Sequence, residues 1–164
     1  LYEGTTSIQA LDLIGRKTAL SQGAGLKLFL AEIQAFIAAN GDNPAVAEFL
    51  PVLGARANEW GTLTRSVLQR AAANPELGEK QVCPKGAASW DYLFYSGYVA
   101  LAYWWARAVA AAQASAHPDA FKQAKLETAR FYYARILPRT LAHAASMESG
   151  AAPLMAMDAA RFGE

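Results

Sequence analysis

The stretch WDYLFYSGYVALAYWWARA, residues 90–108, decides the fold class of this chain. Apolar and aromatic residues recur in it at i, i+3, i+4 and i+7, the spacing that puts side chains on one face of an α-helix. The face predicted for the core consists of Trp90, Leu93, Phe94, Gly97, Tyr98, Leu101, Trp104, Trp105 and Ala108. Only 15 residues separate Asp91 from Arg107, whereas a membrane-spanning helix needs about 20 apolar residues. The pattern therefore predicts a long buried helix and no membrane span.

The same helical period runs through most of the chain, and period-2 alternation is almost absent. Helices are predicted from residue 8 to the glycines at 23 and 25, and over 26–39, 45–73 and 117–146. Pro51 and Pro138 should bend the helices in which they lie, because proline lacks an N–H donor. A loop over 74–86 and a short tail over 152–162 complete the prediction. Long helices joined by short turns predict an all-α, up-and-down bundle.

Composition narrows the classes of function. The 164 residues are 54% hydrophobic with a formal net charge of +1, which supports a folded core and argues against nucleic-acid binding. A single cysteine, Cys83, excludes an internal disulfide and fits a reducing compartment, so we expect a cytoplasmic protein. His117 and His143 have no Cys or carboxylate at ligand spacing, and we predict no metal site.

The rings and charges of the predicted helices favour packing over catalysis. The aromatic residues of 90–108 could form a ligand cage, but their helical spacing makes core packing the better interpretation. A local basic excess is formed by Lys122, Lys125, Arg130, Arg135 and Arg139. These positions spread around the helix, so a solvated face or an interface is expected rather than an anion site.

The opening segment Tyr2-Glu3-Gly4-Thr5-Thr6-Ser7-Ile8-Gln9 is the candidate for chemistry. It sets a carboxylate, Glu3, on a loop directly before a helix start rich in hydroxyls. A helix start presents unpaired N–H groups that suit an anion. A carboxylate beside it can act as a general base if burial raises its pKa. On spacing alone, an ordinary solvated Glu at a frayed end is the competing interpretation.

Two stretches of the chain resemble acyl-CoA dehydrogenases. Residues 1–5 (LYEGT), followed by residues 7–17 (SIQALDLIGRK), are similar to the catalytic-loop segment near the C-terminus of that family. Residues 128–132 (TARFY) with 136–138 (ILP) are similar to the helical extension that one bacterial branch carries after its catalytic helix. The middle of the chain matches only in helical character.

The resemblance implies an FAD-dependent oxidation of an acyl-CoA thioester to the trans-2-enoyl-CoA, as in fatty-acid β-oxidation. Glu3 would match the base that removes the α-proton, and Gly4 would match a substrate-contacting position. Thr5, Thr6 and Ser7 would match the stretch that contacts FAD. An electron acceptor such as electron-transfer flavoprotein and a homo-oligomeric assembly are the partners implied.

The resemblance also implies a division of the chain. Residues 1–40 would be the catalytic-loop segment and last helix of the dehydrogenase C-terminal domain, and 41–164 a helical-bundle extension. We expect a piece of a larger enzyme, so the isolated 164 residues should neither hold FAD nor turn over substrate. The alternatives are a non-catalytic helical interaction module, in which Glu3 is incidental, and a ligand binder built around the tryptophan-rich helix.

Overall fold

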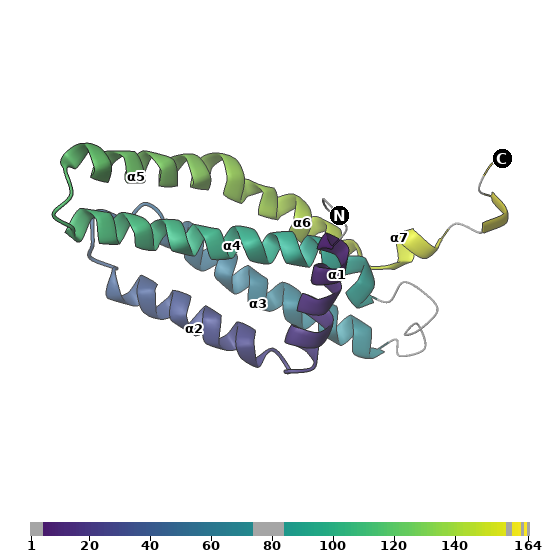
Figure 1. Ribbon diagram of the computed structural model, residues 1–164. Coiled ribbons are helices and arrows are strands. Elements are labelled where there is room, and N and C mark those ends of the chain that lie inside the picture. Colours follow the sequence, from purple (N-terminus) through teal and green to yellow (C-terminus); the bar gives the residue numbers. More distant parts are fainter. Residues whose placement is uncertain (1–4, 74–83, 157–158, 162, 164) are drawn as a thin grey trace.

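The computed structural model describes residues 5–73, 84–156, 159–161 and 163 and is shown in Figure 1. Within these ranges every regular element is a helix, which confirms the all-α prediction. α2, α3, α4 and the α5–α6 pair run alternately in opposite directions as a bundle, and α1 crosses in front of α4 (Figure 1). The α-helices are α1 (Thr6–Leu11), α2 (Ala24–Ala39), α3 (Leu50–Ala73), α4 (Pro84–Ala114), α5 (Asp119–Phe131), α6 (Thr140–Ser149) and α7 (Ala152–Met155).

α4 is the central helix, and it packs against α1, α3, α5 and α6. Its buried face consists of Tyr92, Tyr95, Val99, Ala102, Tyr103, Ala106 and Val109. The inner face predicted from the sequence is therefore wrong, since Trp90, Leu101 and Trp104 are 46%, 50% and 53% exposed. Both sides of α4 are apolar, so periodicity identifies the helix without identifying the side that the neighbouring helices cover.

One hydrophobic core joins the first helices to the rest. Ile14 and Ile33 are both fully buried in the same cluster as Leu53 of α3 and Val99 of α4. Phe29 of α2 meets the Trp60 ring edge-on, with ring centroids 6.0 Å apart. The predicted division of the chain after residue 40 stays a prediction. α2 packs against α3, and its Phe29 also meets the ring of Tyr103 on α4 edge-on.

The helical region that begins at Thr6 changes from α-helical to π-helical geometry. α1 continues directly into a π-helical segment, Asp12–Ala19, in place of the regular α-helix that the sequence predicts. The chain then turns at Gly23, whose φ of 76° lies in the left-handed region that glycine adopts readily. This turn sends α2 back along the bundle.

Proline and asparagine set the beginning of α3. The helix begins at Leu50, so Pro51 lies in its first turn, where the missing N–H is not needed. The predicted start at residue 45 is wrong, because residues 44–49 form turns. Asn43 begins them, since its Oδ1 accepts a hydrogen bond from the N–H of Ala45 at 3.1 Å.

The helix predicted over 117–146 is divided near Pro138, which confirms the expected kink. α5 passes into a π-helical turn, Tyr132–Ile136, and a 3-10 turn, Leu137–Arg139, before α6 begins. The hydroxyls of Tyr132 and Tyr133 donate to the carbonyls of Tyr98 and Ala102, each at 2.9 Å, which holds this irregular segment on α4. Most of the predicted 74–86 loop lies outside the described residues, and α4 already begins at Pro84.

Candidate functional site

The predicted catalytic segment lies at the start of α1. Glu3 and Gly4 lie outside the described residues, so their predicted roles stay predictions. Thr5, Thr6 and Ser7 are described, with Thr5 and Ser7 exposed and Thr6 half-buried. The helix start thus faces solvent beside α4 (Figure 1).

The hydroxyls at this helix start do not cap it. Thr5 occupies the N-cap position with φ −107° and ψ −7°, and its side chain makes no capping hydrogen bond. Its carbonyl accepts the N–H of Gln9 at 2.9 Å. Among the described residues, the hydroxyls of Thr5, Thr6 and Ser7 have no hydrogen-bond partner, and they remain able to bind a group outside this part of the chain.

α1 buries one side and exposes the other. Ala10 is fully buried against the bundle, whereas Ile8 and Leu11 are 63% and 52% exposed. In the following π-helical segment, Arg16 donates two hydrogen bonds to the carboxylate of Asp12. These bonds lower the pKa of Asp12. The outward side of α1 is therefore apolar next to the hydroxyls of its first turn.

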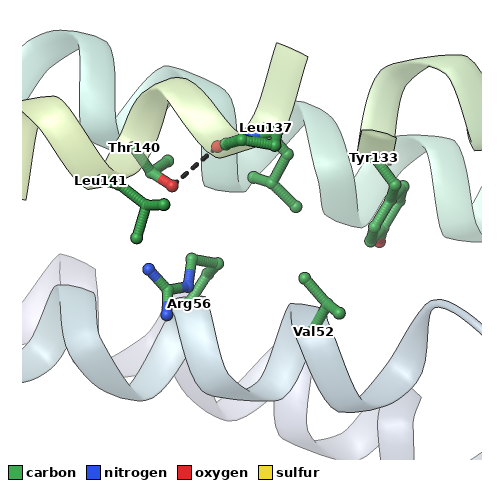
Figure 2. A pocket seen from close by; sticks show the side chains of 7 residues that line it. Val52, Arg56, Tyr133, Leu137, Thr140 and Leu141 are labelled. Carbon is green, nitrogen blue, oxygen red and sulfur yellow. Dashed lines mark hydrogen bonds between the residues drawn. The ribbon is translucent and has the colours of Figure 1, made fainter. Parts of the chain in front are cut away.

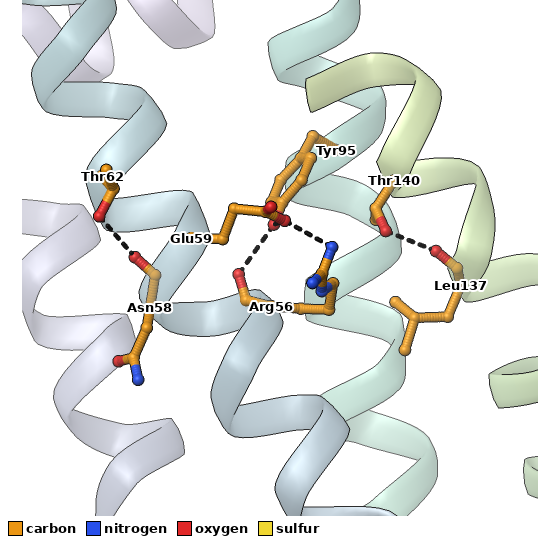
Figure 3. A network of polar contacts seen from close by, with 7 residues as sticks. All are labelled: Arg56, Asn58, Glu59, Thr62, Tyr95, Leu137 and Thr140. Carbon is orange, nitrogen blue, oxygen red and sulfur yellow. Dashed lines mark hydrogen bonds and ion pairs between the residues drawn. The ribbon is translucent and has the colours of Figure 1, made fainter. Parts of the chain in front are cut away.

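A polar network links α3 to α4 in the middle of the bundle (Figure 3). The hydroxyl of Tyr95 lies 2.5 Å from Glu59 Oε2 and 3.0 Å from the carbonyl of Arg56. Arg56 Nη1 forms an ion pair with the same Glu59 oxygen at 2.7 Å. Burial, and then the hydrogen bond to Glu59, raise the pKa of Tyr95. The phenol stays protonated and donates, which suits a structural contact rather than acid–base chemistry at neutral pH.

A cavity of about 190 Å³ lies beside this network, between α3 and the irregular segment before α6 (Figure 2). Its lining residues are Val52, Arg56, Tyr133, Leu137, Pro138, Thr140 and Leu141. Thr140 Oγ1 donates to the carbonyl of Leu137 at 2.7 Å and is thereby satisfied. The walls are largely aliphatic, and the one charged group, Arg56, is already paired with Glu59. The cavity has no group free to act as a nucleophile or base.

A histidine–aspartate pair is the contact that sequence reasoning missed. His143 Nδ1 of α6 lies 2.7 Å from Asp91 Oδ1 of α4, with both side chains about four-fifths buried. The imidazole stacks on Phe94 and Tyr98, with ring centroids 5.6 and 5.7 Å apart. The two residues are 52 positions apart, so no local spacing signals the pair. The contact fastens α6 to α4.

Two classes of site find no support in the part of the chain that is described. No group of three or more His, Cys, Asp or Glu side chains there could hold a metal ion. None of the helices in these residues has the length and apolar character that a membrane span requires.

The other polar residues singled out in the sequence make local contacts. His117 contacts the ring of Phe121. Of the predicted basic excess, Arg130 forms a 2.7 Å ion pair with Glu48.

Comparison with known proteins identifies the family of this helical chain. Residues 29–158 match the family model described as "Acetyl-CoA dehydrogenase C-terminal like". A protein named butyryl-CoA dehydrogenase, from Syntrophomonas wolfei subsp. wolfei (strain DSM 2245B / Goettingen), is 30% identical over 144 residues. That alignment covers 84% of this chain and 22% of the relative, so the chain spans about a fifth of the relative's length. Because the family model covers most of the sequence, the chain belongs to the acetyl-CoA dehydrogenase C-terminal-like family.

Proposed function

We propose that this chain is the C-terminal part of a flavin-dependent acyl-CoA dehydrogenase that oxidises an acyl-CoA thioester to the trans-2-enoyl-CoA. The observation that carries the proposal is the Tyr2-Glu3-Gly4-Thr5 motif directly ahead of α1 in a chain of this family. The name of the relative, a butyryl-CoA dehydrogenase, supports the same reaction class. Membership of a family by itself does not assign an activity, so the chemistry rests on the motif.

Glu3 is the proposed catalytic base. A proton α to a thioester carbonyl is very weakly acidic, so a carboxylate removes it only where the developing negative charge on the thioester oxygen is stabilised. The peptide N–H of Glu3 is a proposed donor to that oxygen. Gly4, having no side chain, would let the thioester approach the backbone closely.

The hydroxyls of Thr5, Thr6 and Ser7 are the proposed contacts to FAD. They fit such a role because they are unbonded within the described chain and lie beside the N–H groups of a helix start. FAD, when bound, supplies the hydride acceptor of the reaction. These residues offer only one edge of a flavin site, so we expect the isolated 164 residues to be colourless and inactive. A purified chain that carries a yellow chromophore, or that reduces an electron acceptor with any acyl-CoA, would contradict this expectation.

The base assignment is tested with Glu3→Gln in an intact dehydrogenase that contains this chain. Flavin reduction after mixing with butyryl-CoA should slow by about 10²–10⁴-fold, the usual contribution of a general base. Substrate affinity should change by only a few fold, because the amide keeps the size of the carboxylate. The matched control is Glu48→Gln, which removes a carboxylate that pairs with Arg130 on the bundle surface. Equal rates for Glu3→Gln and the control would refute the role of Glu3.

The remainder of the bundle, residues 41–164, is the proposed structural extension of the enzyme. Its outward apolar side chains, Trp90, Leu101 and Trp104 on α4, support a role in assembly of a homo-oligomer. Residence in the cytoplasm, a part in β-oxidation and electron transfer to an electron-transfer flavoprotein belong to the same proposal. Truncation of the intact enzyme after Asn40 should change its oligomeric state. An unchanged assembly with unchanged chain-length preference would argue against the extension's role.

The second candidate is a non-catalytic helical interaction module, favoured by the same exposed side chains. The two candidates predict different consequences of losing Glu3. In a module, Glu3→Gln leaves every measurable property of the chain within error, and the reading frame does not extend upstream of Leu1 for several hundred codons. In a dehydrogenase, the reading frame extends and the substitution slows flavin reduction by about 10²–10⁴-fold.

A further inference from the structure

The outward side of α4 carries a continuous apolar strip, which we call the α4 seam. Its successive members are separated alternately by four and by three residues. The seam consists of Trp90, Phe94, Gly97, Leu101, Trp104 and Ala108. Phe94 and Ala108 are half-buried, and the other four are exposed. The seam follows α4 for about five turns without a charged member.

The seam faces away from the core of the bundle. An α-helix turns by about 100° per residue, so Leu101 points about 160° away from the fully buried Val99. On one flank of the seam, His143 of α6 stacks on Phe94 with ring centroids 5.6 Å apart. Leu101 and Trp104 are nevertheless half exposed, so no described segment of the chain covers the seam.

The alternation of four and three residues is the heptad spacing of a coiled coil. Apolar residues that recur every 3.5 residues on average stay in line when two helices wind around each other. A helix side that faces only water does not need this repeat, and a large exposed apolar patch there favours aggregation. The spacing therefore indicates that a second helix covers the seam.

The seam is complementary in size to an antiparallel copy of itself. In a two-fold interface, a contact of residue i with residue j is matched by a contact of j with i. Antiparallel pairing about residue 99 sets Trp90 opposite Ala108 and Leu101 opposite Gly97, so large side chains meet small ones. A Cβ at Gly97 would meet no atom within 4 Å, so the space above this residue is open for a leucine side chain.

Parallel pairing of two seams fits less well. It would set each residue against itself, so Trp90 would meet Trp90 and Gly97 would meet Gly97 of the second copy. One layer would then be crowded and the other would contain a void, and both defects destabilise a packed interface. In the antiparallel pairing, Phe94 lies opposite Trp104, and two aromatic rings in contact attract each other.

The charges that bracket the seam also favour the antiparallel direction. Asp91 and Arg107 lie eight residues to either side of residue 99. Antiparallel pairing brings the Asp91 end of one helix beside the Arg107 end of the other, whereas parallel pairing brings the two arginine ends together. Opposite charges at an interface select the orientation of the partners, and like charges oppose it.

The exposed area of the seam suits a weak interface between two copies. A large aromatic side chain covers roughly 150–250 Å², so Trp90 and Trp104 each leave roughly 100 Å² open to water. Together with Leu101, they supply about half of the roughly 1,200 Å² at which stable interfaces begin. The flanking Leu93 and the stem of Arg107 add to this area. The pairing should therefore depend on concentration in the micromolar range.

From these features we propose that the α4 seam docks a second copy of this chain, antiparallel, with the two-fold axis passing near residue 99. The inference names the interface of the homo-oligomer and to that extent rests on the proposed function. Its tests measure association and require no flavin. Loss of pairing would refute the interface alone, and only flavin reduction in Glu3→Gln bears on the proposed reaction.

Sedimentation equilibrium of the 164-residue chain tests the pairing. We expect a monomer–dimer equilibrium with a Kd of the order of 10 µM. Leu101→Glu places a charge at the centre of the seam and should weaken the dimer about tenfold or more. The matched control is Leu28→Glu, at an exposed leucine of α2, which should leave the Kd unchanged. A chain that is monomeric at about 1 mM, or equal effects of the two variants, would overturn the proposal.

Circular dichroism reports whether each variant is folded. If Leu101→Glu fails to fold, Gly97→Leu replaces it, because a leucine there fills the space that the opposing leucine needs. Gly97→Leu should also weaken the dimer about tenfold or more. Unchanged association of the folded Gly97→Leu chain contradicts the proposed register.

Disulfide trapping tests the direction of pairing. In a Cys83→Ser background, Trp90→Cys and Ala108→Cys chains are oxidised separately and as a mixture. Only the mixture should give linked dimers, because in the antiparallel pairing two copies of position 90 lie about 27 Å apart, at 1.5 Å per residue. Linked dimers from each variant alone would indicate parallel pairing and overturn the proposal.

The same cysteine pair is then placed in an intact dehydrogenase that contains this chain. Linkage between two subunits in the mixed sample would support the seam as the interface of the assembled enzyme. If neither the mixture nor the separate variants form linked subunits, another part of the polypeptide or a different partner covers the seam. That result would overturn the proposal for the intact protein.

Discussion

The inner and outer faces of α4 both carry aromatic side chains, and they differ in the polar partners that lie within reach. On the inner face, Tyr92, Tyr95 and Tyr103 are each at most 1% exposed, and each hydroxyl has a partner on another helix. On the outer face, Trp90 and Trp104 are 46% and 53% exposed. The larger and more apolar rings are outside. A buried polar aromatic ring is tolerated where its hydroxyl is satisfied, so partners, not ring size, separate the two faces.

The largest loss in the free energy of unfolding is expected for Tyr95→Ala, on the inner face of α4. The substitution removes a fully buried ring between α3 and α4, so the free energy of unfolding should fall by about 3–5 kcal/mol. Urea denaturation followed by circular dichroism measures the loss. Tyr95→Phe is the control, because it keeps the ring and removes only the donor to Glu59, at a cost of about 1–3 kcal/mol. A loss below about 1 kcal/mol for Tyr95→Ala would mean that the inner face is not the core.

The next largest loss of stability is expected at alkaline pH, through the buried tyrosine of the inner face and the two that pack on α4. Burial is the largest cause that raises the pKa of Tyr95, Tyr132 and Tyr133 in the folded chain. The unfolded chain ionises its tyrosines near pH 10, so the full stability is present below about pH 10 and decreases as the pH rises towards the higher folded values. The urea midpoint should fall from about pH 9 to about pH 11, and by less in Tyr133→Phe. A midpoint that does not respond to alkaline pH would show that these phenols are solvated.

A smaller effect is expected for Tyr103→Phe. The Tyr103 hydroxyl donates to Glu32 Oε1 at 2.7 Å and accepts from Arg107 Nη1 at 2.9 Å. Glu32 and Arg107 are both about half exposed and can return to water, so the loss should be about 0.5–1 kcal/mol in urea denaturation. A loss above about 2 kcal/mol in the free energy of unfolding would indicate that the Glu32–Arg107 ion pair stabilises the fold more than its exposure to water predicts.

The smallest effect is expected on the outer face. Trp104→Ala removes a ring that is half exposed and contacts the Arg107 guanidinium at 5.2 Å, so stability should change by at most about 1 kcal/mol. Urea denaturation measures this against Leu28→Ala, a substitution at an exposed site on α2. A loss comparable to that of Tyr95→Ala would remove the distinction between the two faces.

Most of the helices follow from local sequence, and the contacts between them do not. The period over 90–108 predicts α4, and Pro138 predicts the interruption between α5 and α6, because a missing N–H is a local property. The beginning of α3 is different, since residues 44–49 carry an apolar pattern but form turns held by Asn43. A side chain that bonds its own backbone competes with the helix there.

The candidate functional residues also differ in whether the sequence alone reveals that they lie together. Glu3, Gly4 and the three hydroxyl residues are found in the sequence as one continuous motif. The His143–Asp91 pair and the cavity between α3 and the irregular segment before α6 draw on helices that are far apart along the chain. No spacing rule brings such residues together, because their distance depends on how the helices pack.

The amino-acid sequence by itself determined that this protein is helical, where its turns begin, and which motif precedes its first helix, since these depend on neighbours within a few residues. Only the tertiary structure decided which side of α4 is buried and which polar groups meet across the core. Both sides of that helix are apolar enough to be buried. The choice between them depends on the partners that α2, α3 and α6 supply to the hydroxyls and charges of α4.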